Sequence, residues 1–250
     1  MSVPGSRSPQ PQQSTQTQDR VQAVPAQYSP VRRTEGLQSP VDLPVSALGP
    51  LDGADPVELA LTSTWWRVVD TGTTIEAQPV TKDGAPAEGA AGGFTVSGTH
   101  YVVAQFHLHA PSEHTFDGAT TDLEVHVVAK EPGTGRTAVI GVPLTVGNDS
   151  SALEPVFASI PEATTFDGGV VMADRLDLAD LLPVGAPTAR FDGSLTTPPY
   201  TEGLVWTVYL EPVTVSAREA DAFVAVHDGN VRPVQPLLDR PIATRTVVTE

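Results

Sequence analysis

The chain has 250 residues and a formal net charge of -16. So acidic a surface would repel nucleic-acid phosphates, and no run approaches the ~18 apolar residues of a membrane span, so we expect no nucleic-acid partner and no membrane partner. The absence of cysteine excludes disulfides and thiolate metal sites, so any metal must bind to imidazole or carboxylate, and imidazole suits zinc.

The first segment differs from the rest in composition. Residues 1–36 are rich in Gln, Pro, Ser and Thr and hold little apolar material to bury, so we predict a disordered tail there. Residues 37–250 are expected to form one domain, because no second block of composition follows. Residues 1–20 lack the apolar stretch of a signal peptide, and a cytoplasmic location is therefore expected.

Short apolar segments then recur between turn signals. They predict strands over residues 65–70, 73–78, 94–97, 101–109, 123–129, 138–146, 170–172 and 204–210. Residues 131–135 read as a hairpin turn between two of these strands. Such a pattern favours a mainly β domain with peripheral helices.

The helical signals are few and short. A helix is expected over residues 151–160, with Ser150 or Ser151 as N-cap and Glu154 near the third position. A short helical turn is expected over residues 177–182. Another helix is expected over residues 216–226, with Ser216 as its cap and Glu219 three residues later.

Three histidines stand out among the predicted strands. His107 and His109 share one face because side chains alternate along a strand, while Phe106 and Leu108 face the other way. His126 lies in the strand expected over residues 123–129. Three imidazoles from two strands would leave a tetrahedral zinc one open position, which is the ligand count of catalytic zinc sites.

Two further side chains share the faces of these histidines. Glu124 lies on the face of His126, and Gln105 lies on the face of His107. Zinc-bound imidazoles usually donate their second N–H to a carboxylate or carbonyl, so both residues are candidate partners. A His-x-His pair also occurs in cupin-like barrels that bind other metals, so an enzyme of another class stays an alternative.

The other three histidines carry weaker signals. His114 is expected to be a buried hydrogen-bonding residue, and His100 and His227 are expected in loops or at the surface.

Five ordered motifs resemble the α-class carbonic anhydrases, in the form that bacterial members carry. They are QFHLHAPSEHT at residues 105–115, LEVHVV at 123–128, SLTTPP at 194–199, QSPVDL at 38–43 and NVRPVQPL at 230–237. Together the motifs cover about residues 37 to 245 in the family's order.

The resemblance implies a fold and a reaction. The fold is a large, twisted, mostly antiparallel central sheet with short peripheral helices, and the chain would be a monomer or dimer. The reaction is the reversible hydration of carbon dioxide to bicarbonate and a proton, catalysed by a lyase through a zinc-bound hydroxide. His107, His109 and His126 match the zinc ligands.

The resemblance also implies roles for other residues. Thr196 matches the threonine that orients the hydroxide, and Glu113 matches the acceptor of the threonine proton. Asn230 matches an asparagine whose backbone carbonyl supports a ligand histidine. The substrate pocket would be lined by Val128, Val139, Leu195, Thr197 and Trp206.

The chain departs from the family at one functional position. Many fast members carry proton away through a histidine partway up the cleft, and the matching residue here is Thr73, which cannot titrate near neutral pH. We therefore predict slow proton release. The aromatic-rich start of the family is also missing, which leaves a catalytically weak or silent binding module as the alternative function.

Overall fold

The computed structural model describes residues 1, 36–147, 151–172 and 174–249. Of the tail predicted over residues 1–36, only the two end residues fall within this part, so the prediction of disorder lies outside the described residues. All statements below concern the unit that spans residues 31–250.

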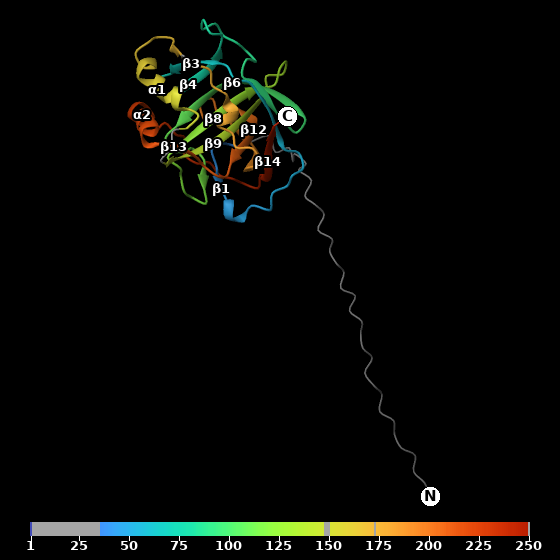
Figure 1. Ribbon diagram of the computed structural model, residues 1–250. Helices are drawn as coiled ribbons and strands as arrows, with labels where there is room; N and C mark the ends of the chain where they lie inside the picture. Colours follow the sequence, from blue (N-terminus) through green and yellow to red (C-terminus); the bar gives the residue numbers. More distant parts are fainter. Residues whose placement is uncertain (2–35, 148–150, 173, 250) are drawn as a thin grey trace. The chain divides into compact units, whose positions relative to one another are not determined.

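The described chain is mainly β (Figure 1). The strands are β1 (Asp42–Leu43), β2 (Val57–Leu61), β3 (Trp65–Asp70), β4 (Ile75–Val80), β5 (Gly92–Val96), β6 (Thr99–His109), β7 (Thr115–Phe116), β8 (Leu123–Lys130), β9 (Thr137–Gly147), β10 (Val170–Val171), β11 (Pro187–Ser194), β12 (Glu202–Tyr209), β13 (Val213–Ser216) and β14 (Ala243–Thr249). The helices are α1 (Glu154–Ala163) and α2 (Ala217–His227), with 3-10 turns at Val45–Ala47 and Leu178–Asp180.

One large sheet contains 12 strands, in the order β10-β3-β4-β6-β5-β2-β14-β11-β12-β9-β13, with β8 paired to both β6 and β9. Most pairings are antiparallel, while β12–β9, β13–β9 and β14–β2 are parallel. β1 and β7 form a separate parallel pair. The expected large, mostly antiparallel sheet is confirmed, and the expected hairpin turn does join β8 to β9.

Buried arginines explain why two strands were missing from the sequence prediction. β1, β2, β7, β11, β13 and β14 were not expected, and β11 and β14 each carry a buried arginine that breaks the apolar pattern. Arg190 Nη1 donates to Asp55 Oδ2 at 2.7 Å, and Arg245 Nη1 donates to Asp52 Oδ2 at 3.1 Å. Because each arginine is paired with an aspartate, it can be buried in a strand, although a charged residue at such a position argues against a strand when only the sequence is considered.

A β-bulge in β6 determines which side chains reach which face. Tyr101 and Val103 are buried in the main core, and after the bulge between Val103 and Gln105 the core-facing positions become Phe106 and Leu108. A bulge inserts one residue on one strand and so re-aims every side chain beyond it. As a result, Gln105 and the two following odd-numbered residues face away from this core.

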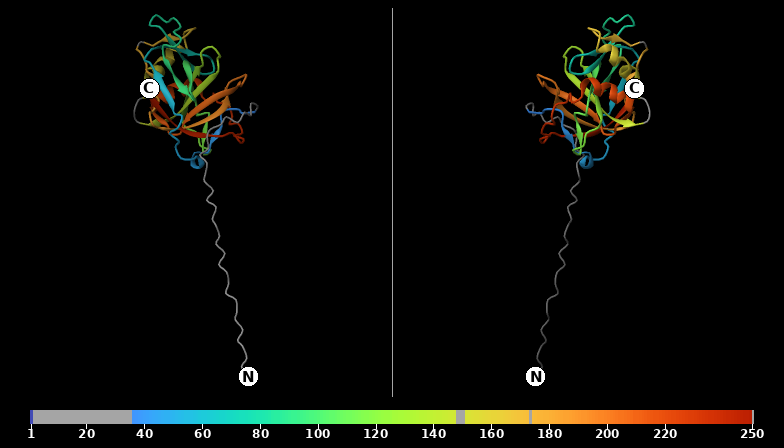
Figure 2. Two further views of the ribbon diagram at one scale, coloured as in Figure 1. Left: turned by 90° about the vertical axis from the view of Figure 1, so that its right-hand side faces the viewer. Right: turned by 90° about the vertical axis from the view of Figure 1, so that its left-hand side faces the viewer.

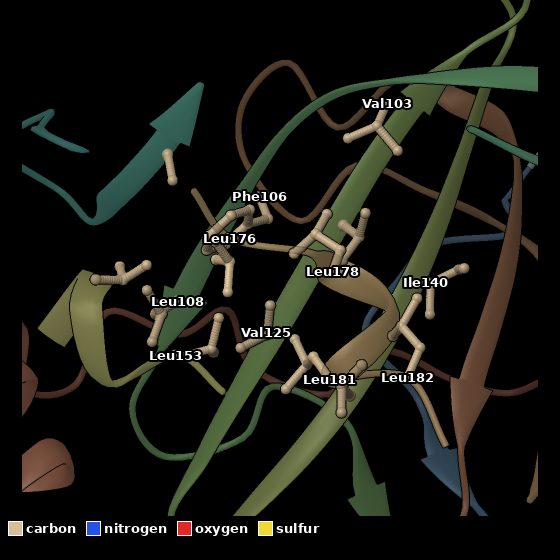
Figure 3. Close-up of a cluster of buried hydrophobic side chains, with 14 of the residues drawn as sticks. Val103, Phe106, Leu108, Val125, Ile140, Leu153, Leu176, Leu178, Leu181 and Leu182 are labelled. Carbon is tan, nitrogen blue, oxygen red and sulfur yellow. The ribbon is translucent and has the colours of Figure 1, made fainter. Parts of the chain in front are cut away.

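The core lies against the far face of β6, β8 and β9. Figure 3 shows Phe106, Leu108 and Val125 from these strands packed with Leu153, at the start of α1, and with Leu178 of a 3-10 turn. The expectation that the two residues flanking His107 face apolar packing is confirmed. Burial of this face leaves the opposite face of the same strands available for polar chemistry.

Both α-helices lie on one flank of the sheet, next to each other (Figures 1 and 2). Neither described helix is long and apolar enough to cross a membrane. α2 begins as expected, with a capping box in which Ser216 Oγ accepts from Glu219 N and the Glu219 carboxylate accepts from Ser216 N.

The predicted cap of α1 is wrong. Its N-cap is Leu153, which makes no side-chain cap, and Pro155 lies in the first turn, where its missing N–H costs nothing. Ser150 lies outside the described residues, and Ser151 instead donates its hydroxyl to Glu219 Oε1 at 2.9 Å. Ser151 therefore links the start of α1 to the capping box of α2.

We expect Ser216→Ala to lower the free energy of unfolding by about 1 kcal/mol, because the α2 N-terminus loses the oxygen that accepts from Glu219 N. Ser216→Thr keeps a hydroxyl and should retain most of the stability. Chemical denaturation followed by circular dichroism measures both. Equal losses in the two variants would contradict a capping role for the hydroxyl.

Candidate metal centre

Strand register brings the three histidines together. His107 of β6 pairs directly with His126 of β8, and His109 pairs with Glu124. Residues directly opposite one another share a face of the sheet, so all three imidazoles project to the same side. Their candidate ligand nitrogens lie within 4.8 Å of one another. The sequence-predicted trio is therefore brought to one point.

Each imidazole has one nitrogen close to an oxygen atom of the protein. His107 Nδ1 lies 2.9 Å from Gln105 Oε1, and His109 Nδ1 lies 2.9 Å from the backbone carbonyl of Asn230. His126 Nε2 lies 3.0 Å from Glu124 Oε1. The structure thus places all three expected partners beside the ligand histidines. The nitrogens left over are Nε2 of the first two histidines and Nδ1 of the third.

Glu124 also belongs to a second group of titratable side chains, with His114 and His126. His114 donates its backbone N–H to Glu124 Oε2 at 2.8 Å, and its Nδ1 lies 2.7 Å from Glu124 Oε1. His114 and Glu124 are fully buried. Because Glu124 Oε1 already faces two imidazoles, this group is a hydrogen-bonded support and not a second metal site, as expected for His114.

Burial and neighbouring charges set the protonation of the site. Burial and repulsion by the neighbouring imidazoles hold the pKa of His107 well below its ordinary value, and burial with His126 lowers the pKa of His109. Burial would also lower the pKa of His126, but Glu124 outweighs it and raises that pKa. Burial would raise the pKa of Glu124, yet His114 and His126 together hold it well below its ordinary value.

Three of these four directions suit a metal site, while the raised pKa of His126 favours its protonated form over a metal ligand. The lowered pKa values keep His107 and His109 neutral, so each offers a lone pair, and the ionised Glu124 balances positive charge beside His126. His109 Nε2 is buried and has no hydrogen-bond partner among the described residues. A buried nitrogen without a partner is costly unless a metal engages it, so the donor set fits zinc.

His107 and His109 line a pocket of about 720 Å³, whereas His126 is not part of its lining. Its lining includes His107, His109, Glu113, Thr196 and Thr197, so the loop expected at the site is present there. The other four residues expected in the substrate pocket are not in this lining. Val128, Val139 and Trp206 belong to an apolar cluster, and Leu195 packs against it.

Glu113 and Thr196 are both buried at this pocket. Glu113 Oε1 accepts from the backbone N–H of Arg232 at 2.8 Å. Its other oxygen, Oε2, lies 3.5 Å from His109 Nε2 and 3.8 Å from His126 Nδ1, and it has no hydrogen-bond partner among the described residues. The structure therefore brings the two residues to one pocket, without the hydrogen bond between them that the resemblance implies.

Sequence reasoning missed one histidine of this pocket. His227, expected in a loop or at the surface, ends α2 and lines the pocket together with Thr73. The expectation was wrong because a helix end and a strand distant in sequence meet here, which no local pattern reveals. His100 is exposed, as expected, although it lies within β6.

Comparisons with known proteins agree on one family. A family model described as eukaryotic-type carbonic anhydrase matches residues 26–246. A carbonic anhydrase of Pectobacterium carotovorum is 34% identical over 189 residues, which cover 75% of this chain and 72% of that protein. One of Klebsiella pneumoniae is 39% identical over 149 residues, an alignment that spans only 59% of that relative.

Solved structures give the same result. An α-carbonic anhydrase of Photobacterium profundum is 34% identical with a TM-score of 0.71, and the match covers 84% of this chain and 90% of that one. An α-carbonic anhydrase of Thermovibrio ammonificans, solved with the inhibitor sulfanilamide, is 33% identical with a TM-score of 0.68, and the match covers 84% and 88%.

We expect Glu124→Gln to weaken zinc binding about 10- to 100-fold, because a neutral amide cannot hold the proton on His126 Nε2 as the carboxylate does. Titration against a competing chelator measures the affinity. Glu162→Gln, which changes an exposed glutamate of α1, serves as the matched control. Equal affinities in the two variants would remove Glu124 from the metal support.

Proposed function

This chain belongs to the eukaryotic-type carbonic anhydrase family, and we propose that it catalyses the reversible hydration of carbon dioxide to bicarbonate and a proton. The observation that carries the proposal is the group of three histidines, each with one nitrogen close to a protein oxygen and the other left for a metal. The substrate is a small molecule, and zinc is the metal that the donor set fits.

His107, His109 and His126 would hold the zinc, which when bound would supply an acidified water molecule as the nucleophile for hydration. The protein's own contribution is to hold the imidazoles in the right tautomer. Gln105 and the Asn230 carbonyl accept from Nδ1 of His107 and His109, which keeps the lone pair on Nε2. Glu124 does the same for His126 at the opposite nitrogen.

Thr196 and Glu113 orient the reacting groups in this proposal. Arg232 N holds one oxygen of Glu113, and the other oxygen is buried without a partner among the described residues. A carboxylate only accepts, so when Thr196 donates its hydroxyl proton to this oxygen, its own lone pairs turn to the pocket. The Thr196 backbone N–H can then stabilise negative charge on substrate oxygen.

An apolar row beside the histidines would hold the nonpolar substrate. Val128 pairs with Gln105, Val139 pairs with Val128, and Trp206 pairs with Val139, so these side chains continue the histidine face across the sheet. Leu195 packs against the same cluster. Thr197, in the pocket lining, is positioned to contact bicarbonate.

Proton release is the slow part of the proposed cycle. The residue that matches the family's shuttle histidine is Thr73, an exposed threonine at the pocket whose hydroxyl does not titrate near neutral pH. We therefore propose a lower kcat than in relatives with a histidine there. Because proton transfer to solution limits turnover, we expect kcat to rise with the concentration of an imidazole-type buffer.

We expect stopped-flow assays of the zinc-loaded protein to show carbon dioxide hydration far above the uncatalysed rate. His109→Ala should lose this activity together with most bound zinc, because a buried ligand nitrogen is removed. His100→Ala, which changes an exposed histidine of β6, should keep both. A zinc-loaded wild type without activity would refute the proposed function and favour a binding module.

We expect Thr196→Ala to lower kcat/KM about 100-fold while zinc content stays unchanged, because the orienting hydroxyl is lost and no ligand is touched. Thr196→Ser retains the hydroxyl and should recover most of the rate. The readouts are initial rates of hydration and metal analysis. An unchanged rate in the alanine variant would show that the hydroxyl does not act.

A further inference from the structure

His227 lines the pocket and makes a hydrogen bond through its ring. Its Nε2 is 2.7 Å from Asp70 Oδ1, and the two side chains are 10% and 21% exposed. Asp70 ends β3, and its Oδ1 also accepts from Gly72 N at 2.8 Å. The histidine is therefore held by the loop that carries Thr73.

A short network joins this corner of the pocket to the metal centre. Asn230, three residues after His227, accepts from His109 through its carbonyl and donates from Nδ2 to Thr73 O at 3.0 Å. Gly229 N also donates to Ala110 O at 2.9 Å. These bonds hold the end of α2 beside the ligand strand, and they keep His227 and His109 in the lining of one pocket.

The two nitrogens of His227 have different surroundings. A carboxylate accepts only, so Asp70 fixes a proton on Nε2, and the neutral imidazole then has its lone pair on Nδ1. No described residue hydrogen-bonds Nδ1. Imidazole is the side chain that ordinarily exchanges protons near neutral pH. His227 thus carries a fixed proton on Nε2 and has a lone pair on Nδ1 that can accept a proton.

Resting on the proposed function, we propose that His227, oriented by Asp70, is the protein's own proton carrier. Nδ1 takes up a proton from water in the pocket, which makes an imidazolium paired with the Asp70 carboxylate. The same proton then leaves Nδ1 for solvent or buffer, and the neutral ring is restored. One N–H bond forms and then breaks, with no other change in bonding or oxidation.

Other charged groups line the space into which His227 faces. They are Glu76 of β4, Glu113, Asp228 and Arg232, besides the metal ligands His107 and His109. Beneath the ring, Phe223 of α2 packs with its ring centroid 6.0 Å away. Carboxylates outnumber cations in this set, which favours the passage of a proton along the pocket wall.

The main test separates proton transfer from the chemical step. His227→Gln can still donate to Asp70 but cannot carry a proton. We expect kcat at low buffer concentration to fall about tenfold or more while kcat/KM stays unchanged, and added imidazole to restore kcat. His100→Gln is the matched control and should match the wild type in all three measurements.

A second readout does not depend on turnover. NMR spectra of the histidine side chains in the zinc-loaded protein, recorded as the pH is varied, should show reversible proton uptake by the His227 ring, and Asp70→Asn should alter this uptake. The same spectra report which nitrogen carries the proton in the neutral ring, and we expect Nε2.

The possible negative results distinguish failure of the proposed function from failure of the proposed role of His227. A wild type without hydration activity refutes the proposed function itself. An active wild type with the same kcat in His227→Gln, or a His227 that does not titrate, overturns the proton carrier and leaves the function standing. A parallel fall of kcat, kcat/KM and thermal stability that imidazole does not restore also overturns it, because it assigns His227 a purely structural role.

Discussion

The rest of the site depends on the buried carboxylate of Glu124. It receives the backbone N–H and the ring of His114 on one side and lies against the ring of His126 on the other. The Glu124 carboxylate fits between the two rings only because the facing position on β9 has no side chain. The partner of His126 there is Gly141, where an added Cβ would lie 2.8 Å from Glu124 Oε1. Gly141 thus leaves room for the Glu124 carboxylate, which keeps His126 in the tautomer with its proton on Nε2.

The metal centre was readable from the sequence because strand alternation is a property of the backbone. The two-residue spacing of His107 and His109, and of Glu124 and His126, places each pair on one face wherever the strand lies in the sheet. Alternation also identified most of the strands around the site. It failed at β11 and β14, whose buried arginines are balanced by aspartates far away in sequence.

Contacts between distant segments were beyond sequence reasoning. The end of α2 meets β6 through bonds that link residues 121 positions apart, such as His109 to Asn230. That contact brings His227 into the pocket, and no pattern of apolar and polar residues in the sequence predicts it. The resemblance did identify Asn230, because it carries information about tertiary contacts that spacing lacks. Sequence reasoning also did not show that Val128, Val139 and Trp206 lie outside the pocket lining, because their burial depends on neighbouring strands.

The bulge in β6 has a consequence for how this chain can evolve. A substitution in this strand changes the contacts of one side chain, whereas a deletion changes the faces of all the residues that follow it. Deleting one residue beyond the bulge, such as Phe106, while Gln105 keeps its pairing with Val128 would exchange the faces of the residues that follow, sending His107 and His109 into the core and Leu108 to the pocket side. The length of this strand is therefore more tightly constrained than its composition.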